Sequence, residues 1–111
     1  MHWRELTYLS IADASERLRR RELSAVELTR ACLEAIADRD TVINAFITVL
    51  AEQALEEAEA VDGEIGGGNH RGPLHGIPVA HKDLYYTRNV RTTAGSKVFA
   101  ELVPDHDATV V

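Results

Sequence analysis

Lys82 is the residue of this 111-residue chain whose type and position most directly suggest chemistry. A short apolar run, IPVA, leads almost directly into it, and Asp83 follows. If residues 77–82 form a strand, alternation places only small neighbours on the face of Lys82, so its side chain could run inward. Burial disfavours the charged ammonium, and a neutral amine is a base. Lys82 is therefore a candidate general base.

A second interpretation is that Lys82 ends a short strand and reaches solvent, as most lysines do. Asp83 bears on the choice, because a direct ion pair with Lys82 would keep the ammonium charged. Alternation points Asp83 to the opposite face, where its carboxylate could bind backbone amides of the following turn. Spacing alone favours the exposed lysine and leaves the buried one open.

Two strings around Lys82 resemble the motifs of a known family. They are PLHGIPVAHKD and RTTAGSKVFAELVPDHDATVV. They are similar to the patterns P-L-x-G-I-P before K-D, T-T-x-G/A-S, and P-x-x-D-A-T-V-V of the amidase signature family. Upstream, ELSAVELTRACLEAIADRD and INAFITVLAEQALEEAEAVD resemble the family's N-terminal helices and first strand more loosely. His81 and the string LYYTRN depart from the family pattern, but neither changes the lysine.

The resemblance implies a hydrolase that cleaves carboxylic amides through a Ser–Ser–Lys triad, with Lys82 as the base. The lysine would take a proton from a bridging serine, held by a cis peptide bond, which would activate the nucleophilic serine. In the family both serines and the oxyanion hole lie in a Gly/Ser-rich segment further along. This sequence ends at Val111, before such a segment.

The fold class that follows is α/β, with helices around a mixed sheet. Residues 1–111 are expected to be the N-terminal part of a single amidase domain, truncated at its C-terminal end. A lysine without a nucleophile and an oxyanion hole has no acyl-transfer machinery. We therefore expect the chain by itself to be inactive, with at most a structural or interaction role.

Two activities are candidates for the parent protein. The first is a stand-alone amidase that acts on a small-molecule amide, which LYYTRN favours. The alternative is the A subunit of a glutamyl-tRNA amidotransferase, which frees ammonia from glutamine. The expected partners are the amide itself and either a second copy in a homodimer or, for an amidotransferase, partner subunits. No residue specifies which amide is the substrate.

Composition excludes several other classes. The formal net charge is −6, which argues against direct nucleic-acid binding. The arginines near residue 20 are flanked by Glu16 and Glu22 and read as a solvated helix end. The chain lacks a spanning apolar run and a signal peptide, so no membrane contact and a cytoplasmic location are expected. Its one cysteine, Cys32, lies on an apolar helical stripe and reads as a small core residue rather than a nucleophile.

No metal or cofactor is expected. His70, His75 and His81 are too irregularly spaced to favour metal ligation. The acidic residues between 51 and 64 read as a solvated helix face, and Asp105 and Asp107 as helix-start residues. The triple glycine 66–68 reads as a flexible connection, because the flanks of a phosphate cradle are missing. Tyr85 and Tyr86 could line a pocket or simply pack.

Local patterns predict the elements that would position Lys82. Capping residues Ser10 and Ser24 start two of the helices, and β-branched runs mark the strands. The expected lead-in and loops are residues 1–9, 38–44 and 62–72. The expected helices are Ile11–Arg20, Ala25–Ala37, Ala51–Val61, Lys97–Leu102 behind Ser96, and one opened by Pro104; the expected strands are residues 45–50 and 77–82.

Overall fold

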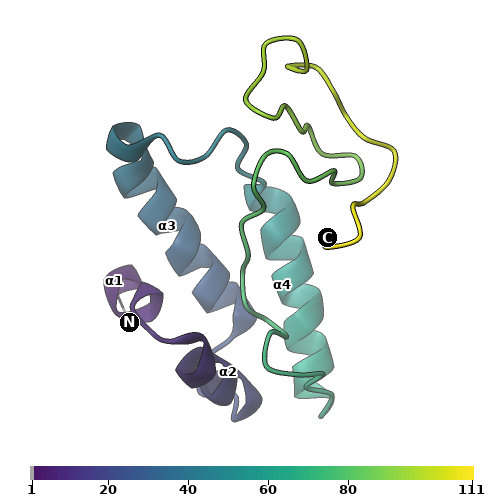
Figure 1. Cartoon of the computed structure of the whole chain (residues 1–111). Helices are drawn as coiled ribbons and strands as arrows, with labels where there is room; N and C mark the ends of the chain where they lie inside the picture. The colour runs from purple at the N-terminus through teal and green to yellow at the C-terminus, as the bar shows by residue number, and fades with distance from the viewer. Residues whose placement is uncertain (1) are drawn as a thin grey trace. The chain divides into compact units, whose positions relative to one another are not determined.

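The computed structural model describes residues 2–111. The chain divides into two compact units. The first, Met1–Pro78, holds the four helices found among residues 2–111, and we call it the helical unit. The second, Val79–Val111, is made of turns and loops, and we call it the C-terminal unit. Figure 1 shows the course of the chain through both units.

The first two helices begin at side-chain caps. Helix α1, Trp3–Thr7, was not expected, because residues 1–9 read as irregular; residue 1 lies outside the described residues. The Trp3 ring lies beside Arg39 of α3, with 5.6 Å between the guanidinium carbon and the ring centre. Helix α2, Ile11–Arg19, begins at Ser10, whose hydroxyl accepts from the Asp13 amide at 3.0 Å, as predicted. Ile11, the first residue of α2, is 55% exposed.

Helix α3, Ala25–Ile43, has a fully satisfied N-terminus. The predicted capping box forms: Ser24 accepts from the Glu27 amide, and Glu27 accepts from the Ser24 amide. The two amides between them, of Ala25 and Val26, donate to the Asp62 carboxylate at 2.6 and 3.1 Å. Because Asp62 comes from another helix, this tertiary cap fixes the start of α3 to α4 as well as satisfying it.

The predicted end of α3 at Ala37 is wrong. The helix continues to Ile43 and stops at Asn44, which has a left-handed backbone with φ +53°. Asp40 explains the stop, because its backbone carbonyl accepts from Asn44 and its carboxylate accepts from the Ala45 amide at 2.6 Å. The polar stretch 38–44 therefore ends a helix instead of forming a separate loop.

Helix α4, Ala51–Gly66, is also longer than expected. Residues 62–66 read as part of a glycine-rich loop, but Ile65 is 5% exposed and belongs to the apolar core. Burial of Ile65 outweighs the weak helix propensity of Gly63 and Gly66. The helix ends at Gly66, and the loop begins at its C-cap residue, Gly67.

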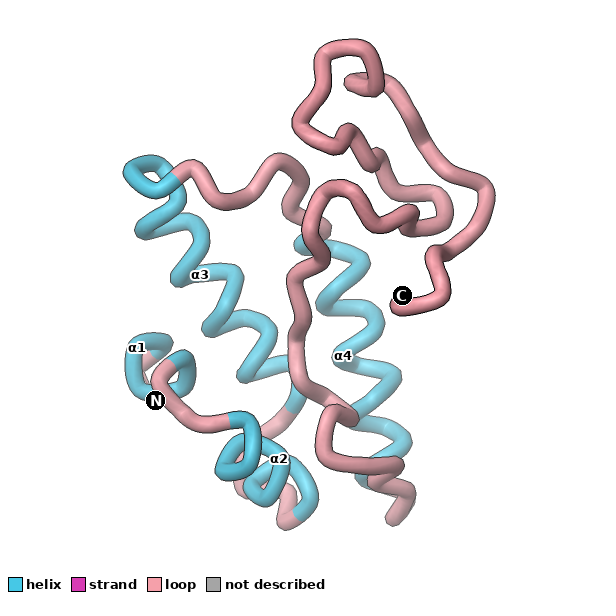
Figure 2. Tube along the Cα trace, in the orientation of Figure 1, coloured by secondary structure: helices cyan, strands magenta, loops and turns pink. Residues whose placement is uncertain are grey.

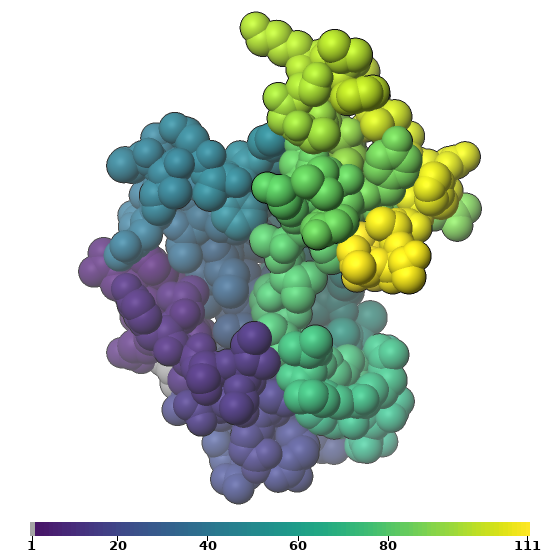
Figure 3. Space-filling view, in the orientation of Figure 1, coloured from purple at the N-terminus to yellow at the C-terminus, as the bar shows by residue number. Residues whose placement is uncertain are grey.

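The core of the helical unit lies among α1, α2, α3 and α4, with α3 packed between α1 and α4. Leu18 and Ala25 are almost fully buried at its centre. Gly76 reaches this centre from the loop after α4, with a φ of +91°. A Cβ on Gly76 would lie 3.1 Å from Leu18 and 3.4 Å from Val61. The glycine of the PLHG string is therefore required by both packing and backbone conformation, and Figure 3 shows its segment pressed against the N-terminal helices.

The predicted mixed sheet is not formed in this structure. Within residues 2–111 there is no strand, only an isolated bridge between Thr87 and Val90, and Figure 2 shows helices and loops alone. The predictions of strands at residues 45–50 and 77–82 are wrong for this chain. A strand needs a neighbouring strand for its hydrogen bonds, and neither segment has one among the described residues. Ile77 packs against the core of the helical unit, but other apolar side chains of the two segments are exposed, including Ile47 at 54% and Val79 at 69%.

The C-terminal unit has no apolar core of its own. Its buried residues are Thr92, Thr93 and Pro104. The helices predicted at 97–102 and after Pro104 are wrong, since both stretches are turns and bends. Across the described residues, no helix is long and apolar enough to cross a membrane.

Candidate active-site segment

Lys82 lies in irregular backbone at the start of the C-terminal unit, and its side chain is exposed. Its carbonyl accepts from the Leu84 and Tyr85 amides at 2.7 and 3.1 Å, which closes a tight turn. The exposed position that spacing favoured is thus the one observed in this chain. Any burial of the Lys82 amine must come from outside the described residues.

Asp83 accepts hydrogen bonds from a loop ten residues further along. Its carboxylate accepts from the Thr93 amide at 2.9 Å, from the Thr93 hydroxyl, and from the Gly95 amide at 3.4 Å. Its backbone carbonyl accepts from the Ala94 amide. Within residues 2–111 Asp83 forms no ion pair with Lys82. The charge of Asp83 is therefore used to organise backbone, not to hold the lysine.

These contacts keep Asp83 ionised. Partial burial alone would raise the pKa of Asp83. The hydrogen bonds from Thr93 and Gly95, together with the nearby charge of Arg91, outweigh burial and place the pKa below its ordinary value of 3.8.

The partner loop, residues 92–96, is shaped to receive a carboxylate. Ala94 and Gly95 both have left-handed backbone, with φ of +52° and +68°. Successive amides in such a turn point into one concavity and form an anion-binding nest, and here Asp83 fills it. Thr92 and Thr93 are each 4% exposed, so the loop that forms the nest is buried at its N-terminal end. Ser96, expected as a helix cap, instead accepts from the Val98 amide at 3.2 Å within a turn.

A second aspartate, Asp107, holds the C-terminal end of the unit. Its carboxylate accepts from the Arg88 amide at 2.7 Å, and the Ala108 amide donates to the Tyr86 carbonyl at 2.7 Å. Asp107 was expected at a helix start, and the structure places it across two loops instead. Asp105 pairs with its neighbour His106 at 2.8 Å and is almost fully exposed.

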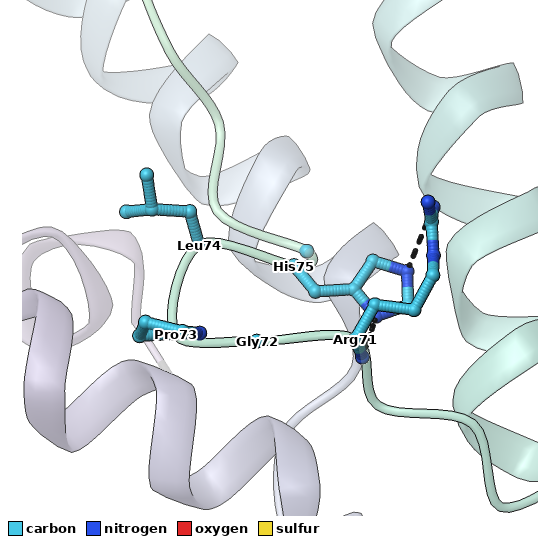
Figure 4. Close-up of a pocket in the computed structure, with 6 residues that line it drawn as sticks. Arg71, Gly72, Pro73, Leu74 and His75 are labelled. Atoms are coloured by element: carbon cyan, nitrogen blue, oxygen red, sulfur yellow. Dashed lines mark hydrogen bonds between the residues drawn. The ribbon is translucent and has the colours of Figure 1, made fainter.

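The PLHG turn forms a shallow hollow in the helical unit, lined by residues 71–76 (Figure 4). His75 lies under it with a side chain only 6% exposed. Its Nδ1 accepts from the Arg71 amide at 3.0 Å, so Nε2 carries the hydrogen and donates to Glu64 at 2.8 Å. Arg71 also pairs with Glu64 at 3.0 Å. The turn is thereby tied to the end of α4.

The structure does not bring the three candidate histidines into a metal site. The His70 and His75 rings lie 5.7 Å apart between centres, and His81 lies in the other unit. No group of three or more His, Cys, Asp or Glu side chains is arranged for a metal anywhere in the described part of the chain. Cys32 is half-buried, and burial raises the pKa of its thiol, which disfavours the reactive thiolate.

Sequence reasoning missed Thr93 as the partner of Asp83, and Glu64 and Asp62 as structural carboxylates. The signal for Thr93 was present in the string TTAG, since a glycine after two threonines suggests a turn whose amides converge. Asp62 and Glu64 were grouped with the solvated acidic face of α4. Their distinguishing feature is position, because both lie on the last turns of α4 beside other elements.

The amidase family model, described as Amidase, matches residues 27–111. Curated relatives include the A subunit of glutamyl-tRNA(Gln) amidotransferase from Geobacter metallireducens, 49% identical over 107 residues, covering 96% of this chain and 22% of the relative. The Azotobacter vinelandii protein of the same name is 47% identical, covering 93% of this chain and 21% of the relative.

A solved structure is similar in fold as well as in sequence. It is described as an unexpected vestigial protein complex that reveals the evolutionary origins of an s-triazine catabolic enzyme. The TM-score is 0.84 at 32% identity, over 89% of this chain and 22% of that one. The chain thus spans about a fifth of the length of the proteins it matches. The family match covers well over half of the residues, so the chain belongs to the amidase family.

Proposed function

We propose that this chain is the N-terminal part of a longer amidase that cleaves carboxylic amides through a Ser–Ser–Lys triad, with Lys82 as the base. Family membership supports the reaction class. The observation that carries the role of Lys82 is its anchored backbone: its carbonyl closes the turn at residues 82–85, and the carboxylate of the adjacent Asp83 is held by a second loop. The only other lysine, Lys97, has no carboxylate next to it in the sequence that could bind a second loop.

The proposed reaction assigns one proton transfer to Lys82. Its neutral amine takes the proton of a bridging serine, which takes the proton of the nucleophilic serine as that oxygen attacks the amide carbonyl. The lysine then returns its proton to the bridging serine, which gives a proton to the leaving nitrogen as the carbon–nitrogen bond breaks. Water next attacks the acyl-enzyme and gives a proton to the same relay, which returns one to the nucleophilic serine as the acid leaves. Both serines are proposed to lie in the four-fifths of the protein outside this match.

A neutral amine requires that the complete protein cover Lys82. In this chain the side chain is exposed, and it is burial that disfavours an ammonium. We therefore propose that the serine-bearing part packs over the turn at residues 82–85. This coverage would desolvate the amine and exclude bulk water from the acyl-enzyme.

The second candidate function is that of the A component of an amidotransferase, which would use glutamine as the amide. The curated relatives described above carry that name, at 47–49% identity. This similarity favours the amidotransferase, whereas the LYYTRN string favoured a stand-alone enzyme. Under this candidate the protein acts with partner subunits, and in both cases we propose a cytoplasmic location.

Ammonia release by the complete protein tests the proposal. Lys82→Met should lower kcat for amide hydrolysis by at least about a thousandfold, whereas Lys97→Met should leave kcat within about twofold. Equal activity of the two variants would refute the role of Lys82. The 111-residue chain alone should give no turnover. Glutamine hydrolysis that depends on added partner subunits would favour the amidotransferase, and hydrolysis of simple amides without them the stand-alone amidase.

A further inference from the structure

Asp83 is joined to the Thr93–Gly95 loop by four hydrogen bonds. Both carboxylate oxygens and the backbone carbonyl of this one residue accept from three consecutive residues. A carboxylate that accepts several hydrogen bonds is held in one orientation and in one charge state. Asp83 therefore behaves as a fixed point in a unit that has no apolar core.

The fixed point lies next to Lys82 along the chain. A trans peptide fixes the distance between neighbouring Cα atoms, so a held Asp83 restricts where the Cα of Lys82 can lie. The Lys82 carbonyl, in the peptide group that joins it to Asp83, also accepts from the Leu84 and Tyr85 amides. The backbone on the C-terminal side of Lys82 is thus held, while its side chain is exposed.

The Asp83 carboxylate also does not engage the neighbouring lysine in this structure. Asp83 forms no ion pair with Lys82 among the described residues. An ion pair would favour the charged ammonium and oppose a base. Thr93 and Gly95 provide the alternative partners that keep the Asp83 carboxylate engaged, while the Ala94 amide donates to the Asp83 backbone carbonyl.

We propose that Asp83 is a positioning residue for Lys82, and that the Thr93 hydroxyl is the partner through which it acts. This inference rests on the proposed function, in which Lys82 is the base. Displacement of a reacting group by about 1 Å can lower a rate by about a hundredfold. Loosening of the Asp83 nest is therefore expected to slow proton transfer without removing the amine and without changing substrate contacts made elsewhere.

Thr93 offers a matched pair of variants for the test in the complete protein. Thr93→Val keeps the shape and removes the hydroxyl, whereas Thr93→Ser keeps the hydroxyl and removes a methyl group. We expect Thr93→Val to lower kcat about 10- to 100-fold with KM within about twofold, and Thr93→Ser to stay within about threefold of the parent. Asp83→Asn should resemble Thr93→Val, because an amide nitrogen replaces one of the two acceptor oxygens.

The outcomes separate this inference from the proposed function. If Lys82→Met abolishes hydrolysis but Thr93→Val and Asp83→Asn leave kcat unchanged, the positioning role is wrong and the base assignment stands. If Lys82→Met has no effect, the proposed function itself fails.

A merely structural role for the nest would lower the amount of folded protein. Active-site titration measures the amount of folded enzyme and would reveal that loss. If kcat per folded active site of Thr93→Val equals that of the parent, the positioning role is overturned. If Asp83→Asn does not fold, the two Thr93 variants still decide the matter.

Discussion

Different interactions stabilise each of the two units internally. The helical unit buries apolar side chains from all four helices around Leu18 and Ala25. The C-terminal unit buries two threonines and a proline, and aspartate-centred hydrogen bonds connect its loops. The first unit is fixed by non-directional burial, the second by directional contacts that set the backbone at Lys82. Scaffold and candidate site are thereby separated within the same short chain.

The largest expected effect is the loss of a core side chain in the helical unit. Leu18 is 1% exposed, so Leu18→Ala should lower the free energy of unfolding by about 3 kcal/mol through lost burial and a residual cavity. The matched change in the C-terminal unit, Val98→Ala, removes an 85% exposed side chain and should cost less than about 0.5 kcal/mol. Urea denaturation followed by circular dichroism measures both. Similar costs would mean that the two units do not differ as described.

Alanine substitutions at Gly76 and Gly68 separate the destabilisation caused by a steric contact from that caused by left-handed backbone alone. Gly76→Ala should destabilise the helical unit by about 2 kcal/mol, because the new methyl group meets Leu18 and the backbone is left-handed. Gly68→Ala has a similar φ, +88°, but no atom within 4 Å of the added carbon, and should cost only about 1 kcal/mol. Equal losses in thermal denaturation would remove the argument that Gly76 is part of the core.

The tertiary cap of α3 allows a comparison of two acidic residues on one helix. Asp62→Asn should lower the free energy of unfolding by about 1.5 kcal/mol, since it weakens two charge-assisted hydrogen bonds to α3. Glu59→Gln makes the same chemical change on the exposed face of α4 and should be nearly neutral. Chemical denaturation of the two variants provides the check, and a loss shared by both would indicate a general charge effect.

The smallest effect is the pH response of the nest. Because the pKa of Asp83 is lowered in the folded chain, its contribution is complete above the ordinary value of 3.8 and is lost as the pH falls through the lowered pKa. Asp83 is partly exposed, so solvent screening should limit this contribution to less than about 1 kcal/mol. The amide chemical shifts of Thr93 and Gly95 should move in this acidic range, and Asp83→Asn should abolish the movement. Shifts that titrate identically in Asp83→Asn would show that another group is responsible.

The starts of α2 and α3 were predictable from the sequence because their causes are local, whereas α1 was missed. Ser10 and Ser24 cap the turns that immediately follow them. Helix ends were not, because Asp40 and the buried Ile65 extend two helices beyond their apparent polar stops. The strands at 45–50 and 77–82 failed for the opposite reason: their residues favour extended structure, but pairing depends on partners distant in sequence.

The candidate site shows the same division between local and distant causes. That Asp83 would bind backbone amides was predictable from its residue type, but the donors lie ten residues further along rather than in the next turn. The role of Lys82 came from the family resemblance, and it remains a prediction. Lys82 is exposed in this chain, so its proposed role depends on contacts with residues distant in sequence.

A structure of the complete protein tests the central claim most directly, through the surroundings of the Lys82 amine. We expect a buried amine nitrogen about 2.6–3.2 Å from a serine hydroxyl, with the Asp83 carboxylate still bound to the Thr93–Gly95 loop. A Lys82 amine that extends into bulk solvent in the complete protein, with no serine within reach, would contradict the account.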